Sequence, residues 1–159
     1  MTETSPLPHP GVHFPPPLIF VAGIAIGWLL NRRWPWPITA GASRGRMLIA
    51  VLCFTIWLAF MLAAFVTFLR ARTAIIPNRP AARLVTSGPY RFTRNPMYVS
   101  MVALYVAVTL AINSWWPLLL LPLVVLVLQR VVIAREERYL ASAFPAEYAE
   151  YRRRVRRWL

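Results

Sequence analysis

Three long stretches of the chain contain no charged residue, and they set the pattern of its hydrophobic positions. They cover residues 4–31, 47–69 and 95–129. A helix needs roughly 20 apolar residues to cross the hydrocarbon core of a bilayer, and residues 47–69 supply 23. The second stretch therefore predicts a transmembrane helix.

The third stretch is 35 residues long, which is more than one crossing needs. Asn113, Ser114 and Pro117 lie near its middle, and residues of these types favour turns. We therefore expect a hairpin of two short helices.

The first stretch is rich in proline before its apolar part begins. Proline is accepted in the first turn of a helix but not in its interior. We therefore expect a helix at about residues 16–30, preceded by a proline-rich tail of residues 1–15, with residues 16–159 forming one domain. A cleaved signal peptide is the alternative. Against it, no lysine or arginine precedes the apolar run, and Trp28 and Asn31 stand where small residues would be expected.

The last part of the chain has apolar residues at the spacing of one helix face. They are Leu140, Phe144, Tyr148, Tyr151, Val155 and Trp158. Five arginines among residues 152–157 give this predicted helix a basic side, which would meet anionic headgroups of the cytoplasmic leaflet. A helix that only anchors the chain is the alternative. The predicted fold class is all-α, an integral membrane protein with about four transmembrane helices and a C-terminal amphipathic helix.

Charge orients the predicted helices in the membrane. Charged residues make up 14% of the chain and hydrophobic residues 58%, whereas about a quarter of a soluble domain is charged. All 18 basic residues are arginine, with four between the first two predicted helices and fourteen on the opposite side. The arginine-rich side faces the cytoplasm. We therefore expect a multi-pass protein of the inner membrane with both termini cytoplasmic. The outer interface then holds Trp34, Trp36, Trp115 and Trp116.

Composition excludes several other kinds of site. Cys53 is the only cysteine, so the chain has no intrachain disulfide and no cysteine-cluster metal site, and no metal is expected. The six glycines do not form a Gly-x-Gly-x-x-Gly motif. The lipid bilayer is the expected partner. Nucleic acid is not, because helices buried in lipid leave little free basic surface.

Polar and turn residues are dense in residues 84–98, just before the third apolar stretch. Gly88 and Pro89 mark a turn, and Asn95 is suited to cap a helix that begins at Pro96. This structural interpretation leaves unexplained the spacing of four that separates Tyr90, Arg94 and Tyr98. A face rich in hydrogen-bond donors would suit an anionic or aromatic ligand.

Two of the five acidic residues, Glu136 and Glu137, stand side by side after the last apolar stretch. A charge at the edge of the membrane is costly unless it is paired, and Arg135 and Arg138 offer a structural partner. A carboxylate that meets a cationic ligand is the functional alternative.

Several motifs in order resemble a family of membrane enzymes. They are Leu-Val-Thr-Ser-Gly-Pro-Tyr at residues 84–90, Arg-Asn-Pro-Met-Tyr at 94–98, the glutamate pair, and Phe-Pro-Ala-Glu-Tyr-Ala-Glu-Tyr at 144–151 with Arg154-Val155. This half of the chain, about residues 84–158, is similar to the isoprenylcysteine carboxyl methyltransferases and the related phospholipid N-methyltransferases.

The resemblance implies S-adenosylmethionine as cofactor, bound on the cytoplasmic side between the third and fourth helices and the C-terminal helix. It assigns no catalytic residue. The positions that it implies for the cofactor pocket are Leu84, Val85, Tyr90, Asn95, Pro96, Met97, Tyr98 and Glu136.

Departures from the family pattern bear on the methyl acceptor. Asn95 stands where histidine is usual, and Val132 stands where the carboxyl methyltransferases place a substrate-binding arginine. Arg130 or Arg135 would have to take over that role. By resemblance the lipid-soluble or amphiphilic acceptor is a carboxylate of the isoprenylcysteine type. An amine headgroup is one alternative, and a non-catalytic membrane scaffold or binding protein is another.

Overall fold

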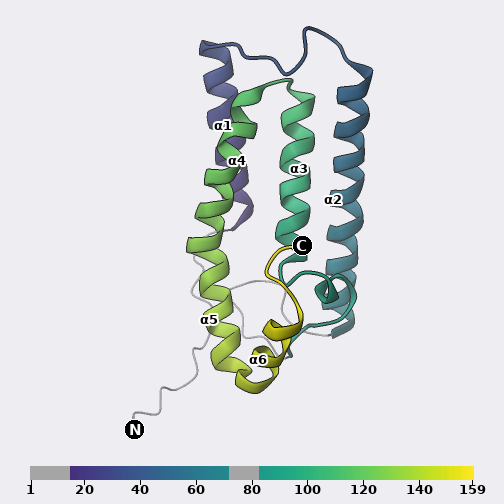
Figure 1. The fold of residues 1–159 in the computed structure, drawn as a ribbon, viewed down its shortest axis with the longest axis vertical. Coiled ribbons are helices and arrows are strands. Elements are labelled where there is room, and N and C mark those ends of the chain that lie inside the picture. The colour runs from purple at the N-terminus through teal and green to yellow at the C-terminus, as the bar shows by residue number, and fades with distance from the viewer. Residues whose placement is uncertain (1–14, 72–82) are drawn as a thin grey trace.

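The computed structural model describes residues 15–71 and 83–159, and every regular element within them is a helix (Figure 1). This confirms the all-α fold class. Apart from Pro15, the predicted proline-rich tail lies outside the described residues. The elements are α1 (Pro17–Arg33), α2 (Arg44–Ala71), the 3-10 helix η1 (Gly88–Arg91), α3 (Pro96–Ala111), α4 (Trp115–Leu128), the π-helix η2 (Gln129–Ile133), α5 (Ala134–Ala143) and α6 (Pro145–Arg154).

Two helical stretches are long and apolar enough to cross a membrane. The first is α2, with 28 residues, and the second runs from Trp115 to Ala143 through α4, η2 and α5. Only 11% of the most apolar part of α2 is buried inside the protein, and Leu48 is 70% exposed. A soluble core helix would be mostly buried, so this surface is suited to lipid. With 17 and 16 residues, α1 and α3 are shorter than the usual span.

Two glycines allow α1 to pack closely against α4. Gly23 and Gly27 are both buried. A Cβ atom at Gly27 would lie 2.7 Å from the backbone of Pro117, and one at Gly23 would lie 2.5 Å from the Val124 side chain. Small residues four positions apart, here two glycines, thus let the two helices approach closely. On the other side of the bundle α2 packs along α3 (Figure 1).

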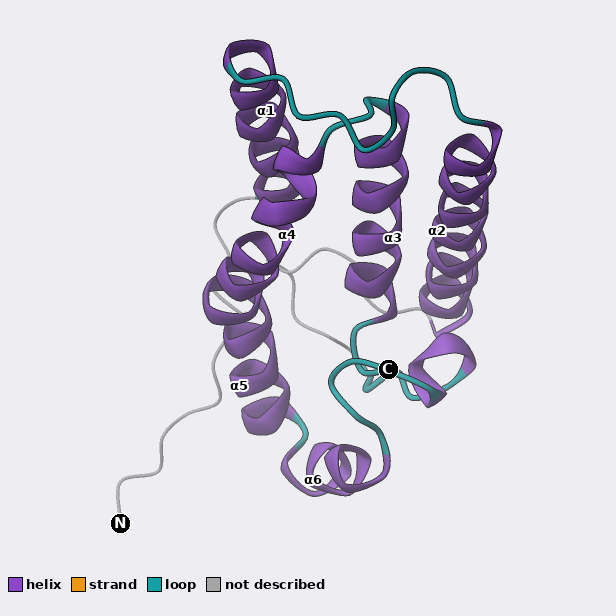
Figure 2. Cartoon of the chain, turned by 45° about the horizontal axis from the view of Figure 1, so that its top comes forward, coloured by secondary structure: helices purple, strands orange, loops and turns teal. Residues whose placement is uncertain are grey.

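The predicted hairpin turn lies between α3 and α4, at residues 112–114. Asn113 has a φ of 54°, which asparagine tolerates, and Ser114 caps α4 by accepting a hydrogen bond from the Trp116 amide. The Asn113 side chain also accepts hydrogen bonds from the Ile38 and Thr39 amides at 3.1 and 3.0 Å. The loop between α1 and α2 is therefore tied to this turn (Figure 2).

Four tryptophans meet at the same end of the bundle. The Trp36 ring contacts the rings of Trp115 and Trp116, and the Trp116 indole donates to the Trp34 carbonyl at 2.7 Å. Their gathering at one end is the arrangement that an aromatic belt requires.

The predicted C-terminal amphipathic helix is divided, so the expectation of one continuous helical stripe is wrong. Phe144 leaves helical geometry between α5 and α6, because the residue before a proline is disfavoured in the α region. Val155 and Trp158 follow the end of α6. Tyr148 and Tyr151 are 2% and 3% exposed, and Trp158 packs against the main hydrophobic core. The aromatic side of this segment therefore faces the protein.

Candidate functional site

The π-helix η2 leads the chain from the apolar helix α4 to the glutamate pair. Val132 and Ile133, at its end, are fully buried in the core formed with α1 and α3. π-helical turns are rare and frequent at functional sites. Glu136 follows Val132 by one helical turn, so it emerges on the same inward side of the bundle.

Glu136 and Tyr98 meet across the bundle. The Tyr98 hydroxyl, near the start of α3, donates to the Glu136 Oε1 atom at 2.7 Å. A hydrogen bond to a carboxyl oxygen at this distance is a strong, oriented contact. Residues that are 38 positions apart in the sequence are thereby brought to one point.

Tyr90 lies beside this contact. It is 8% exposed, and its ring meets that of Phe68 edge-on at 5.4 Å. Burial raises the pKa of the Tyr90 phenol, and nearby Tyr151 and Glu136 raise it further. Tyr90 is therefore a neutral aromatic group close to the Glu136 carboxyl.

Several other residues that the resemblance implies for the pocket pack toward α2. Val85, Tyr90 and Met97 share a hydrophobic cluster with Ala64 and Phe68 of α2. Pro96 is fully buried, and Leu84 is half-buried. The turn between Leu84 and Pro96 requires glycine at position 88. Its φ is +60°, and a Cβ atom there would lie 2.5 Å from the Thr67 hydroxyl.

Asn95 stands before the first residue of α3, as predicted, but its side chain does not cap the helix. Its amide nitrogen donates to the carbonyl of Arg157 at 3.0 Å, and the Thr93 hydroxyl donates to the same carbonyl at 3.0 Å. The Arg94 amide donates to the carbonyl of Arg156 at 2.9 Å. Residues 93–95 therefore hold the last residues of the chain in place.

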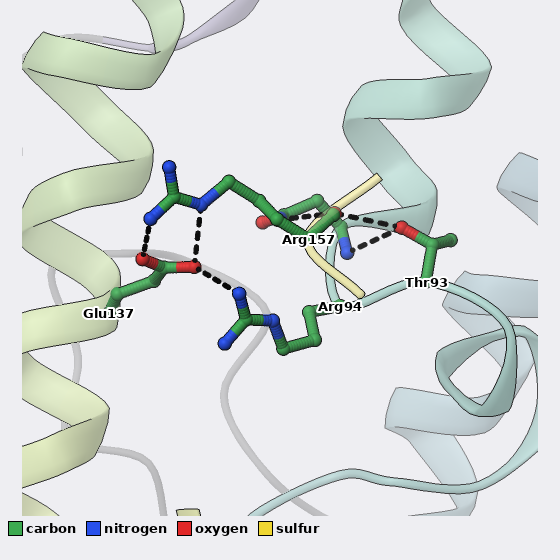
Figure 3. Close-up of polar contacts among 5 residues, drawn as sticks. Thr93, Arg94, Glu137 and Arg157 are labelled. Atoms are coloured by element: carbon green, nitrogen blue, oxygen red, sulfur yellow. Dashed lines mark hydrogen bonds and ion pairs between the residues drawn. The ribbon is translucent and has the colours of Figure 1, made fainter. Parts of the chain in front are cut away.

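Glu137 binds two arginines from separate segments (Figure 3). Arg94 Nη2 lies 3.3 Å from its Oε1 atom, while Arg157 reaches both oxygens, at 3.0 and 2.5 Å. The side chains of Glu137 and Arg94 are 14% and 11% exposed, and that of Arg157 is 43% exposed. The hydrogen bonds that Arg157 donates to the Glu137 carboxylate raise the pKa of Arg157. The two glutamates therefore differ, since Glu137 makes the structural ion pair and Glu136 meets Tyr98.

The three residues considered for the acceptor differ in their exposure. Val132 is fully buried in the core, while Arg130 is exposed. Arg135 is half-buried and interacts with other groups of the protein.

Sequence reasoning missed two contributions from α6 and the C-terminal segment. The Tyr151 hydroxyl donates to the carbonyl of Tyr90 at 2.7 Å, which fixes η1 against α6. The second is the pair of hydrogen bonds that the Thr93 and Asn95 side chains donate to the Arg157 carbonyl. Both are contacts between segments about 60 residues apart, which local patterns do not reveal.

Comparison with known proteins places these observations in a family. The family of phospholipid methyltransferases matches residues 45–147, more than half of the 159 residues. The chain therefore belongs to this family of membrane methyltransferases.

Two relatives share part of the chain. The cobalt-zinc-cadmium resistance protein CzcN of Cupriavidus metallidurans is 40% identical over 80 residues, which are 50% of this chain and 37% of that protein. An uncharacterized protein of Haemophilus influenzae is 41% identical over 63 residues, which are 40% of this chain and the whole of that protein. The chain thus spans little more than a third of CzcN. No solved structure matches. Within the described residues, no three histidine, cysteine or acidic side chains are grouped to hold a metal ion.

Removing the Arg157 side chain tests whether the Glu137 pair holds the C-terminal segment. In Arg157→Gln we expect the amide of Arg94, which bonds to the carbonyl of Arg156, to exchange its hydrogen about tenfold faster, because a hydrogen bond to a charged group contributes roughly 1.5 kcal/mol. The measurement is amide hydrogen exchange of the detergent-solubilised protein. Arg156→Gln, an exposed neighbour, is the control. Equal exchange in both variants would show that the pair does not hold the segment.

Proposed function

We propose that the protein is an S-adenosylmethionine-dependent methyltransferase of the cytoplasmic membrane that acts on a lipid-soluble or amphiphilic acceptor. Membership of the phospholipid methyltransferase family supports methyl transfer. The observation that carries the cofactor assignment is the hydrogen bond between Tyr98 and Glu136 beside the Tyr90 ring.

The residues present fit the chemistry of this cofactor. Its sulfonium and ammonium groups are cations, which carboxylates and aromatic faces stabilise. Glu136 offers the first and Tyr90 and Tyr98 the second. When bound, the cofactor would supply its methyl group to the nucleophilic atom of the acceptor, with S-adenosylhomocysteine as the leaving group. The contribution of the protein is to align the two reactants and exclude water. Tyr98 orients the Glu136 carboxyl, and the cluster of Val85 and Met97 with α2 forms a dry wall.

An amine headgroup is the acceptor that we favour over an isoprenylcysteine-type carboxylate. The carboxyl methyltransferases place an arginine at the position of Val132. In this chain that side chain is apolar and fully buried. The family description, phospholipid methyltransferase, points in the same direction. Arg130 is exposed, so it contributes no preformed anion site in the pocket.

Cofactor binding tests the enzyme assignment. In a calorimetric titration of the purified protein in detergent with S-adenosylhomocysteine, we expect Glu136→Gln to weaken binding at least tenfold and Tyr98→Phe about fivefold, because a charged contact contributes roughly twice as much as a neutral hydrogen bond. Glu147→Gln removes an exposed acid of α6 and should bind normally. Absence of saturable binding by the folded wild-type protein would favour a non-catalytic scaffold.

The acceptor class can be read from the chemical stability of the product. The protein is incubated with radiolabelled S-adenosylmethionine and total membrane lipid, and the labelled lipid is then treated with base. A methyl ester releases its label as volatile methanol, whereas an N-methyl group retains it. We expect the label to stay with the lipid. Volatile label would instead identify a carboxylate acceptor.

We further propose four crossings, with the site at the cytoplasmic face and the exposed arginines of α6 near anionic headgroups. The support is the arginine asymmetry together with the gathering of the tryptophans at the opposite end. Single cysteines at the exposed positions Ala40 and Thr86, in a Cys53→Ala background, test this. An impermeant thiol reagent added to intact cells should label position 40 and leave position 86 unlabelled. The reverse result would invert the topology.

A further inference from the structure

Arg94 is a largely buried cation whose hydrogen bonds are incompletely satisfied by the described residues. Its Nη2 atom pairs with Glu137 at 3.3 Å. Its Nε and Nη1 atoms are buried and find no acceptor within the part of the chain that the structure describes. Buried polar groups are nearly always hydrogen-bonded, and an exception calls for an explanation. Glu137 must also serve Arg157, so one carboxylate faces two guanidinium groups.

The Tyr148 hydroxyl is a second buried donor at this place. Tyr148 is 2% exposed, and its hydroxyl has no hydrogen-bond partner within residues 15–71 and 83–159. The pKa of the Tyr148 phenol is raised to about 12. Burial is the main cause, the Glu137 carboxylate adds to it, and the Arg94 guanidinium opposes it. The phenol is therefore neutral at physiological pH, lies near Arg94, and can donate a hydrogen bond.

These donors adjoin the Glu136 pocket. Tyr151 lies near Arg94, whose charge lowers the pKa of the Tyr151 phenol against the larger effect of burial. The Tyr151 hydroxyl binds the carbonyl of Tyr90, and the Tyr90 phenol lies near Glu136. Arg94 is therefore linked to Glu136, the residue proposed to meet the sulfonium, through Tyr151 and Tyr90.

An acceptor-only group of negative charge would satisfy these donors. A carboxylate has two oxygens and about four lone-pair positions, so it can accept from the guanidinium and the phenol at once. The amino-acid part of S-adenosylmethionine carries such a group beside its ammonium. A pocket with Glu136 on one side and Arg94 on the other would match that pair of charges.

We propose that Arg94 and Tyr148 form a carboxylate-binding subsite beside the Glu136 pocket, and that its ligand is the carboxylate of the cofactor's amino-acid part. This inference rests on the proposed methyltransferase function. The same chemistry could be supplied by a carboxylate acceptor, and the experiment below separates the two sources.

The test compares S-adenosylhomocysteine with its decarboxylated analogue, which keeps the nucleoside, the sulfur and the amine. Both are titrated into the full-length protein in detergent. We expect the wild-type protein to bind S-adenosylhomocysteine at least about tenfold more tightly, as charged hydrogen bonds require. Arg94→Gln should remove this preference and leave the affinity for the analogue within about twofold. Tyr148→Phe, which keeps every charge, should reduce the preference about fivefold.

Arg91→Gln is the matched control, because Arg91 is exposed and lies three residues from Arg94. It should keep the full preference. Arg94→Gln leaves the pair of Arg157 and Glu137 intact, and thermal unfolding of each variant verifies the fold. Should Arg94→Gln fail to fold, the result for Tyr148→Phe decides.

Each outcome has a separate meaning. If the wild-type protein binds both ligands equally, and neither Arg94→Gln nor Tyr148→Phe weakens the binding of a prenylated cysteine relative to its carboxamide, the subsite is refuted while the methyltransferase assignment stands. If the variants weaken only the prenylated cysteine, the subsite is supported with the acceptor as the source of the carboxylate. If the folded protein binds neither nucleoside, the proposed function itself fails.

Discussion

Two consecutive carboxylates toward the C-terminal end of a long apolar helical stretch constrain the rest of this structure. A buried charge is costly unless a partner compensates it, so the segments around α5 must supply partners in two directions. Tyr98 of α3 donates a hydrogen bond to Glu136, while Arg94 and Arg157 form ion pairs with Glu137. Through these contacts the glutamate pair joins α5 to the start of α3 and to the C-terminal segment.

The candidate site follows from this junction. Because Glu137 and Asn95 both bind Arg157, the last residues of the chain are fixed at the base of the bundle, where Trp158 completes the core. Tyr151 attaches η1 in the same way. The segment that resembled an anchor for the membrane is therefore also a structural part of the site. The buried Tyr148 and Tyr151 pack against the rest of the protein, while the arginines of α6 are exposed at its surface.

The membrane-facing part of the protein is simpler than the site it supports. Apolar helices are suited to lipid on their outer faces, and α1 approaches α4 closely because Gly23 and Gly27 remove side chains from the contact. At the far end, Asn113 ties the loop between α1 and α2 to the α3–α4 turn. The family relationship covers residues 45–147, so it runs from α2 to the first residues of α6 and does not include α1.

The sequence by itself determined the positions of the helices and the hairpin turn, because gaps between charges, proline and turn residues act over a few positions. It also indicated Glu136, Tyr90 and Tyr98 as one group, through ordered motifs that resemble a family. It missed the break at Phe144, although the proline after it is a local signal. Only the tertiary structure decided which glutamate meets Tyr98 and which meets arginine, and that Asn95 turns from its helix to hold Arg157. These choices depend on segments tens of residues apart, whose approach is set by packing of the whole bundle rather than by any local preference.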